Sequence, residues 1–175
     1  MPRCKICKEK FTPRFTSLQR TCEKPSCIIE MSKIDKERKW AKEKKERKEN
    51  LMTLQDYIKA CQQVFNAFIR KRDTGKPCIS CDRPLKGKYD AGHYYSVGAY
   101  PNLRFDEDNV FGQCTHCNMH KGGNISEYAL RLPKRIGQEA FDALTERRMM
   151  PKNYSIPEIK EKITYYKSLI KNTSE

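Results

Sequence analysis

The sequence predicts an α+β protein in which helices predominate and two small segments are organised around paired cysteines. Three observations predict this class. Eight of the nine cysteines fall into two groups of four, and each group consists of two close pairs. Two long stretches lack glycine and proline and are rich in helix-forming residues. The hydrophobic fraction is only 37 %, so one large apolar core is not expected and small units need a metal or disulfides to hold them.

Composition and charge exclude several classes of protein. The chain carries 36 Lys and Arg against 22 Asp and Glu, a net charge of +14, which favours a polyanionic partner such as nucleic acid. No run approaches the length of a membrane span, so no membrane partner is expected. The first ten residues lack an apolar signal segment, so secretion and a disulfide scaffold are not expected. The paired cysteines therefore indicate metal binding.

The charge is distributed unevenly along the chain. Residues 1–27 and 70–88 each have a net charge of +5, whereas residues 89–125 have a net charge of −2. A divalent-cation site on a phosphate-binding protein would give this pattern. Four acidic residues in such a segment are also an ordinary density, so charge alone leaves both interpretations open.

The first cysteine group lies in residues 1–27 and predicts a zinc knuckle. Its members are Cys4, Cys7, Cys22 and Cys27. Zinc is held tetrahedrally by four such ligands. A structural zinc supplies on the order of 10 kcal/mol of folding free energy, which so short a segment cannot obtain from burial. Phe11, Phe15 and Leu18 are expected to form a minimal core over the site. The knuckle either contacts DNA or only anchors the helix that follows.

Residues 28–75 are expected to form a long basic helix and then an amphipathic one. Residues 28–50 are crowded with Lys and Glu, and form either a solvated helix or arm or a helix that contacts DNA. Thr53 and Asp56 are spaced like a capping box at the start of the second helix, which extends to residue 72. Its apolar face consists of Leu54, Ile58, Cys61, Phe65 and Phe68. Cys61 has no cysteine nearby in the sequence and is expected to be a buried core thiol.

The second cysteine group defines residues 76–125 and predicts a second structural zinc. Its members are Cys78, Cys81, Cys114 and Cys117. The two pairs are separated by a 32-residue insert, which is longer than in a simple finger. The insert contains the runs Asp-Ala-Gly-His, Asn-Leu-Arg-Phe and Asp-Asn-Val, and Asn-Met-His-Lys-Gly follows the last cysteine.

These residues resemble the motif of HNH (His-Me finger, ββα-metal) nucleases. In that family a His ends a first strand, an Asn lies in the hairpin loop, and an Asn or His opens a helix after Cys-x-x-Cys. His93, Asn109 and Asn118 fit these positions in order, and Lys121 fits the Lys that often follows. The resemblance implies a compact, treble-clef-like, zinc-stapled ββα nuclease motif with a catalytic Mg²⁺ or Mn²⁺.

A wider resemblance covers nearly the whole chain. An N-terminal cysteine knuckle, a Lys/Glu helix and a GHYYS…NLRF…DNVFGQC..CN..KGGN block are together similar to the phage NinG (Rap) recombination nuclease family. This resemblance implies an enzyme of the cytoplasm of a bacterial host cell. It implies that the chain cuts branched DNA, such as Holliday junctions and D-loops, during recombination.

The residue types themselves also fit phosphodiester hydrolysis. Phosphodiester hydrolysis needs an activated water and stabilisation of charge on the phosphate and the leaving oxygen. His93 can act as the general base because an ordinary His pKa of ~6.5 leaves it neutral at physiological pH. Asn109 is expected to fix either the orientation of His93 or the geometry of the loop. Asn118 offers the hard oxygen that Mg²⁺ or Mn²⁺ prefers, whereas the thiolates suit a separate zinc.

One position departs from the HNH pattern. Many members carry a metal-ligating Asp or His directly before the catalytic His, but here that residue is Gly92. Asp90 is the candidate replacement, either as a direct ligand or in a supporting structural role.

Further polar and aromatic residues are assigned by type. The candidate DNA-binding residues are Arg83, Lys86, Lys88, Arg104 and Lys121. His116 is expected to be exposed, and His120 to lie on the surface unless it replaces a thiolate or touches phosphate. Tyr94, Tyr95 and Tyr100 are assigned to packing of the hairpin.

Residues 126–175 are expected to form a helical C-terminal segment. One or two short helices split at Pro133, and a last helix starts at Ser155-Ile156-Pro157-Glu158. Its apolar stripe consists of Ile159, Ile163, Tyr166, Leu169 and Ile170. This stripe must dock on the same core or on a second subunit. Because resolving a four-way junction needs two symmetric cuts, we expect a homodimer, with this stripe and the helix over 28–50 as candidate interfaces.

The function that we predict is a metal-dependent endonuclease acting on branched DNA, with no small-molecule cofactor. Two alternatives stay open. One is a non-catalytic zinc protein that binds DNA as an accessory factor, and the other is a sequence-specific homing or restriction enzyme. Charge and zinc fit both the branched-DNA endonuclease and the non-catalytic zinc protein, whereas only a nuclease explains the spacing of His93, Asn109 and Asn118.

Overall fold

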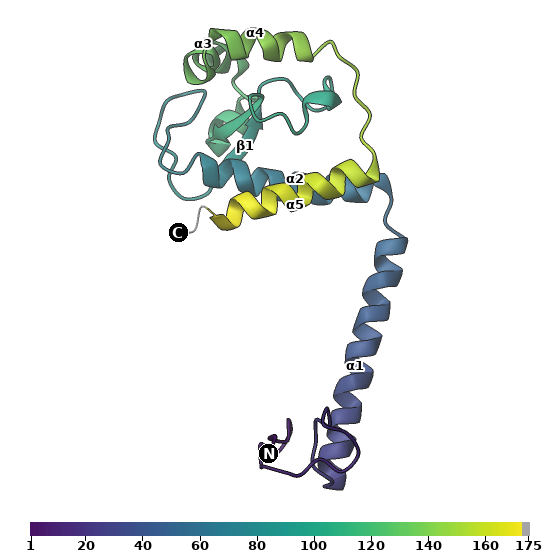
Figure 1. The fold of residues 1–175 in the computed structure, drawn as a ribbon. Helices are drawn as coiled ribbons and strands as arrows, with labels where there is room; N and C mark the ends of the chain where they lie inside the picture. Colours follow the sequence, from purple (N-terminus) through teal and green to yellow (C-terminus); the bar gives the residue numbers. More distant parts are fainter. Residues whose placement is uncertain (173–175) are drawn as a thin grey trace. The chain divides into compact units, whose positions relative to one another are not determined.

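The computed structural model describes residues 1–172 and divides the chain into two compact units, residues 1–52 and the residues from Thr53 onward. Figure 1 traces both units along the chain. The architecture is mixed but mostly helical, with a single small two-stranded sheet among the described residues. No helix within residues 1–172 is long and apolar enough to cross a bilayer.

The first unit contains the cysteine knuckle and helix α1 (Pro25–Asn50). Helix α1 starts with a proline at its first turn and buries only Cys27 and Met31 of its own residues. Its Trp40 is 63 % exposed. The helix therefore has one end packed on the knuckle and is otherwise solvated, and it starts before the expected boundary at residue 28.

The knuckle differs from the prediction in one respect. Phe11 packs against the buried cysteines as expected. Phe15 and Leu18 do not, because they are 80 % and 84 % exposed. The prediction that all three form a core over the site is therefore wrong. The loop that carries Phe15 and Leu18 turns outward, and the buried centre of the knuckle is made largely by its own cysteines.

In the second unit, helices α2 (Leu54–Arg72) and α5 (Ile156–Asn172) pack against each other. Figure 1 shows α5 lying along α2. Both begin at capping boxes, in which Thr53 bonds with Asp56 and Ser155 with Glu158. The rings of Phe65 and Tyr166 meet across the pair with centroids 4.9 Å apart. The stripe on α5 therefore docks on the same chain.

The sheet consists of two antiparallel strands, β1 (Asp90–His93) and β2 (Val110–Gln113). The register pairs Asp90 with Gln113 and His93 with Val110. The loop between the strands contains the 3₁₀ turn η1 (Pro101–Leu103). Strand β2 is buried along its whole length, so it forms the inner strand, and β1 carries the half-buried His93 at its end.

Two anchors join the sheet to α2. The carboxylate of buried Asp73, at the end of α2, accepts from the backbone N–H of Gly112 at 2.8 Å. The guanidinium of Arg72 donates to the carbonyl of Val110 at 2.7 Å and lies over the ring of Phe111. The predicted burial of Cys61 is also confirmed, because this thiol on α2 is 0 % exposed.

Beyond β2 the chain forms the short π-helical turn η2 (His116–His120), then α3 (Ile125–Ile136) and α4 (Gln138–Arg147). The predicted split at Pro133 is wrong, because Pro133 lies inside α3. The break falls at Gly137, whose φ of +90° is easily adopted only by glycine. The core around these elements consists of Ile79, Leu103, Phe111, Tyr128, Leu132 and Leu144.

Candidate functional site

The first cysteine group comes together as its spacing predicts. The four sulfur atoms of Cys4, Cys7, Cys22 and Cys27 lie within 4.8 Å of one another. The sulfurs of Cys7 and Cys22 are 3.7 Å apart. Tetrahedral zinc with Zn–S bonds of about 2.3 Å requires sulfurs separated by about 3.8 Å. None of the cysteines is in a disulfide, so this cluster could hold a zinc ion.

The second group forms an equivalent cluster in the other unit. Cys78, Cys81, Cys114 and Cys117 also lie within 4.8 Å of one another, and the sulfurs of Cys81 and Cys114 are 3.8 Å apart. The backbone N–H of Cys114 donates to the sulfur of Cys78 at 3.3 Å, and the Asn124 side chain donates to Cys117. Such N–H groups favour thiolate ligands. This cluster could therefore hold a second zinc ion.

Arg83 lies at this cluster. Its Nε donates to the sulfur of Cys81 at 3.5 Å. Burial raises the pKa of the Cys81 thiol, but hydrogen bonds, led by that of Arg83, outweigh burial and lower the pKa to about 6. The guanidinium therefore supports a thiolate ligand, which is a role that the sequence interpretation of Arg83 as a DNA contact did not include.

A buried amide links the second cluster to the strands. The Nε2 of Gln113 donates to the hydroxyl of Ser80, between two cluster cysteines, and to the carbonyl of Gly123, each at 2.5 Å. Gln113 and Ser80 are 0 % exposed. The loop before the sheet and the segment after η2 are thus fixed to the same residue of β2.

The departure at Gly92 has a structural reason. A Cβ atom at this position would lie 2.1 Å from Oε1 of Gln113 on the paired strand. Real Cβ atoms essentially never approach another atom so closely, so Gln113 leaves no space for a side chain. A metal-ligating Asp or His directly before His93 is therefore sterically excluded while Gln113 keeps this position.

His93 is held in one orientation by a backbone group. Its Nε2 lies 3.0 Å from the carbonyl of Arg104, and because a carbonyl only accepts, Nε2 carries the proton. Within residues 1–172, Nδ1 has no hydrogen-bond partner. Burial lowers the pKa of His93 below its ordinary value, outweighing the hydrogen bond to the Arg104 carbonyl, which raises it, and the nearby charge of Arg104 acts in the same direction as burial. The imidazole is therefore neutral at pH 7, with Nδ1 available to accept a proton.

Asn109 is a buried residue that holds the loop between the strands. Its Oδ1 accepts from the N–H of Tyr95 at 2.7 Å, and its Nδ2 donates to the carbonyls of Tyr95 and Leu103. The amide is 0 % exposed and uses its donors and acceptor inside the loop. Of the two predicted roles, the geometry fits the one of fixing the loop. Because Leu103 precedes Arg104, Asn109 also positions the carbonyl that orients His93.

Asn118 and His93 line the same open cleft, which has a volume of about 490 Å³. The cleft is also lined by Tyr94, Tyr95, Ser96, Val97, Tyr100, Gly122, Gly123 and Ile125. The Nδ2 of Asn118 donates to Oδ2 of Asp90 at 3.3 Å, which leaves Oδ1 without a partner among the described residues. The structure therefore brings two of the predicted site residues, His93 and Asn118, to one cleft, whereas Asp90, at the start of β1, contacts Asn118 but does not line the cleft.

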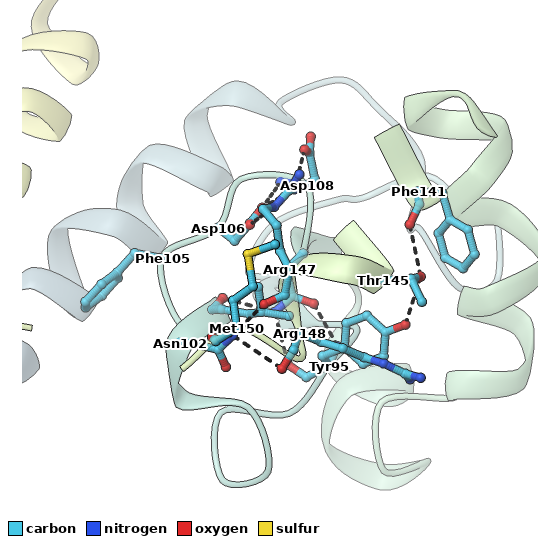
Figure 2. A network of polar contacts seen from close by, with 12 residues as sticks. Tyr95, Asn102, Phe105, Asp106, Asp108, Phe141, Thr145, Arg147, Arg148 and Met150 are labelled. Carbon is cyan, nitrogen blue, oxygen red and sulfur yellow. Dashed lines mark hydrogen bonds and ion pairs between the residues drawn. The ribbon is translucent and has the colours of Figure 1, made fainter. Parts of the chain in front are cut away.

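The loop between β1 and β2, which contributes Tyr95 to this cleft, is braced by the end of α4, and Figure 2 shows the contacts. Arg147 forms ion pairs with Asp106 and Asp108, and Asn102 donates to the carbonyl of Arg147 at 2.8 Å. The hydroxyl of Tyr95 lies 3.2 Å from that of Thr145 on α4. The loop over residues 94–109 is thus held at both ends of its span.

The other predicted DNA contacts are spread around the second unit. The backbone carbonyl of Arg104 contacts His93, and its guanidinium reaches Gln62 of α2 at 3.4 Å. Lys86 and Lys88 are exposed on the loop before β1, and Lys121 is exposed at the end of η2. His116 and His120 are exposed on η2, as expected. None of these residues lines the cleft with His93.

Sequence reasoning missed the backbone carbonyl of Arg104 and the Gln113 link. No residue type signals a carbonyl that orients a histidine, so the first could not be found from the sequence. The Gln113 link had a weak signal in the sequence, because its partner Ser80 lies between two predicted zinc ligands.

Comparison with known proteins assigns the chain to a family. The family described as "Bacteriophage Lambda NinG protein" matches residues 1–175. "Protein ninG" of Escherichia phage 933W is 42 % identical over 158 residues, covering 81 % of this chain and 79 % of that protein. The proteins of the same name from Escherichia phage lambda and Salmonella phage P22 are each 41 % identical over 162 residues, covering 81 % of this chain and 78 % and 79 % of their own length. No solved structure matches. The chain therefore belongs to the NinG family of bacteriophage proteins.

Proposed function

We propose that this chain is an HNH (His-Me finger) type endonuclease that uses a divalent cation to cut branched DNA, such as Holliday junctions and D-loops, in phage recombination. The observation that carries the proposal is the cleft that His93 and Asn118 share, with Nδ1 of His93 free of protein partners within the described residues. The order of two antiparallel strands and a helical turn, stapled by a cysteine cluster, supports the ββα comparison. The preference for branched DNA rests on the family resemblance.

The chemistry assigned to His93 is that of a general base. Neutral His93 takes a proton from a water molecule at Nδ1, while Nε2 stays bonded to the carbonyl of Arg104. The water oxygen forms a bond to phosphorus as the bond to the 3′ oxygen breaks, and the 3′ oxygen takes its proton from solvent. Asn109 acts through the loop as a positioning residue, because its amide is buried and makes its hydrogen bonds within the loop.

Asn118, which shares the cleft with His93, and its partner Asp90 suit a hard cation. Asn118 and Asp90 offer an amide oxygen and a carboxylate, which are the donors that Mg²⁺ and Mn²⁺ prefer, with water and substrate phosphate as the other ligands. Bound there, the cation would stabilise the charge on the phosphate and on the departing oxygen. Within residues 1–172, groups of three or more His, Cys, Asp or Glu that could hold a metal form only at the two cysteine clusters. The proposed cation site therefore depends on the substrate for completion.

Replacement of His93 tests the proposal directly. Purified His93→Ala is expected to bind four-way junction DNA like the parent protein and to lose Mg²⁺-dependent nicking by at least about a hundredfold, the usual contribution of a general base. His116→Ala is the matched control, because it removes an exposed imidazole outside the cleft. Undiminished nicking by His93→Ala would overturn the base assignment. Absence of nicking by the parent protein would leave the non-catalytic DNA-binding alternative.

The substrate needs its own test. Junction, D-loop, flap and linear duplex DNA of shared sequence should be compared under the same Mg²⁺ concentration, with zinc measured on the same sample. The proposal expects cutting that follows the branch. Cutting that follows sequence and ignores branching would instead indicate a homing or restriction type of enzyme.

We also propose that the chain acts as a homodimer, because two symmetric cuts need two sites. The apolar stripe of α5 is covered by α2 of the same chain, with Ile159 and Tyr166 buried there. The exposed helix α1 is therefore the candidate interface. Sedimentation analysis of the free protein and of its junction complex would test this stoichiometry.

A further inference from the structure

Two large apolar side chains of the knuckle face solvent. Phe15 is 80 % exposed and Leu18 is 84 % exposed, whereas Phe11 in the same segment packs against the cysteine cluster. A 52-residue unit that is short of apolar burial gains nothing for its own stability by leaving both in water. Their exposure therefore does not serve the stability of the knuckle.

The loop that carries them is organised. The side chain of Gln19 accepts from the N–H groups of Arg14 and Phe15 at 2.9 and 3.3 Å, and donates to the carbonyl of Thr21 at 2.8 Å. The hydroxyl of Thr16 accepts from the N–H of Leu18 at 3.2 Å. These bonds hold the turn from within the loop, and the two apolar side chains are exposed on it.

The knuckle that carries this apolar tip has a net positive charge. Residues 1–27 hold seven basic and two acidic side chains. The guanidinium of Arg14 lies 5.8 Å from the centre of the Phe15 ring. An apolar tip with basic neighbours fits a polyanion that exposes apolar faces. In a continuous duplex the base faces are stacked on one another, whereas at a branch point a base step is opened and its faces are accessible.

We propose that Phe15 and Leu18 insert at the opened base step of a DNA branch point, while the basic side chains of the knuckle contact the flanking phosphates. Apolar side chains are known to enter unstacked base steps in this way, and aromatic rings stack on bases without sequence preference. The choice of branched DNA rests on the proposed function, but the insertion does not depend on cleavage. The knuckle then supplies the discrimination between branched and linear DNA.

Binding without cleavage tests this role. Full-length, zinc-loaded parent protein and the double variant Phe15→Ala/Leu18→Ala are titrated, without Mg²⁺, onto a four-way junction and onto a linear duplex of the same sequence. The variant is expected to lose about tenfold in junction affinity, in line with the contribution of base–aromatic stacking, and to bind the duplex like the parent. A 2-aminopurine at the branch point should change its fluorescence with the parent and not with the variant.

Two controls exclude a general surface effect. Leu51→Ala removes an equally exposed leucine, 81 % exposed, in the same unit and should bind both DNAs like the parent. Phe15→Trp with Leu18 retained keeps an apolar ring and should keep the junction preference. Equal zinc content in all variants shows that the knuckle is intact.

The contrary results are distinct from those of the nuclease test. Unchanged junction affinity in the double variant, or an equal loss on junction and duplex, would overturn the insertion and leave the tip for a protein partner. These measurements record binding and not cleavage, so they stay interpretable if His93 is not the general base. Conversely, nicking at the cleft would remain intact if the insertion is wrong.

Discussion

The two cysteine clusters of this protein have the same ligands but different surroundings. In the first unit the buried residues at the cluster are Cys4, Cys22 and Cys27 themselves, with Ile6 and Phe11 only partly buried against them. In the second unit the cluster borders a continuous apolar core. Ile79, which directly follows Cys78, is one of the buried residues of that core. The first cluster is thus the centre of its unit, and the second joins segments of a unit that already has a core.

The difference shows how one ligand pattern serves two purposes. A short knuckle without an apolar interior depends on the metal for its folding free energy. The second cluster instead fixes the ends of the insert, because its last two cysteines flank the start of η2 and its first two flank Ser80, which Gln113 holds. Spacing of cysteines alone does not distinguish these roles, whereas burial around them does.

The largest expected effect is loss of the zinc ion that the first cluster could hold. Cys22→Ser should reduce the zinc content by one of two ions and unfold the knuckle, because metal binding contributes on the order of 10 kcal/mol in such small domains. Limited proteolysis with identification of the fragments measures the result: cleavage should concentrate in residues 1–24, while residues beyond Thr53 stay protected. A knuckle that stays protected without its zinc would mean that the first unit has a core of its own.

Truncation of one phenylalanine in each unit sharpens the comparison. Phe65 on α2 is 0 % exposed and meets the rings of Phe105 and Tyr166 at 5.7 and 4.9 Å. Phe65→Ala should lower the free energy of unfolding by about 3–5 kcal/mol, because it leaves a cavity in the core. The matched variant Phe15→Ala removes an exposed ring and should leave stability nearly unchanged. Similar losses in thermal or urea unfolding of both variants would contradict the assignment of the core to the second unit.

A smaller effect is expected where the second cluster is tied to the sheet. Gly92→Ala places a Cβ against Gln113 and should cost about 1–3 kcal/mol, as overpacking of a buried site does. Nicking should also fall, because Gln113 and the end of β1 must shift beside His93. Gly98→Ala is the control, since a Cβ there meets nothing within 4 Å and its φ is not in the left-handed region. Equal stability of the two variants would show that Gln113 moves aside freely.

Local sequence signals predicted the elements well, and contacts between distant residues account for what they missed. The capping pairs Thr53–Asp56 and Ser155–Glu158 located two helix starts, because a cap is made within one turn. Cysteine spacing located both clusters, because each cluster is built from two close pairs of cysteines. The packing of Gln113 on Gly92 depends on the register of two strands, and no local sequence pattern predicts that packing.

The errors have physical causes as well. Phe15 and Leu18 were expected inside because apolar residues near a metal site usually cover it, but Gln19 holds their loop outward. Pro133 was expected to break a helix, but the break came at Gly137, where a positive φ is required. At the candidate site, the motif selects His93 and Asn118, which share a cleft, whereas the carbonyl that orients His93 belongs to the backbone and has no signal in the sequence.

The smallest expected effect concerns the protonation of His93, and it applies only to the second unit. Burial lowers its pKa below the ordinary value of ~6.5, so the folded protein keeps the neutral base to lower pH than a free imidazole would. The nicking rate should therefore stay level from pH 8 down past pH ~6.5 and decline only below it.

The free energy of unfolding should depend on pH in the same direction. Because the pKa of His93 is lower in the folded protein, the unfolded chain binds the proton first, so the contribution of His93 to stability is complete above pH ~6.5 and is lost as pH falls through the folded pKa. Nicking rates and urea unfolding midpoints measured between pH 5 and 8 test both statements, with His93→Gln as the reference that lacks the titrating group. An acid decline that starts above pH ~6.5 would mean that the imidazole is more exposed to solvent than its half-buried position at the end of β1 indicates.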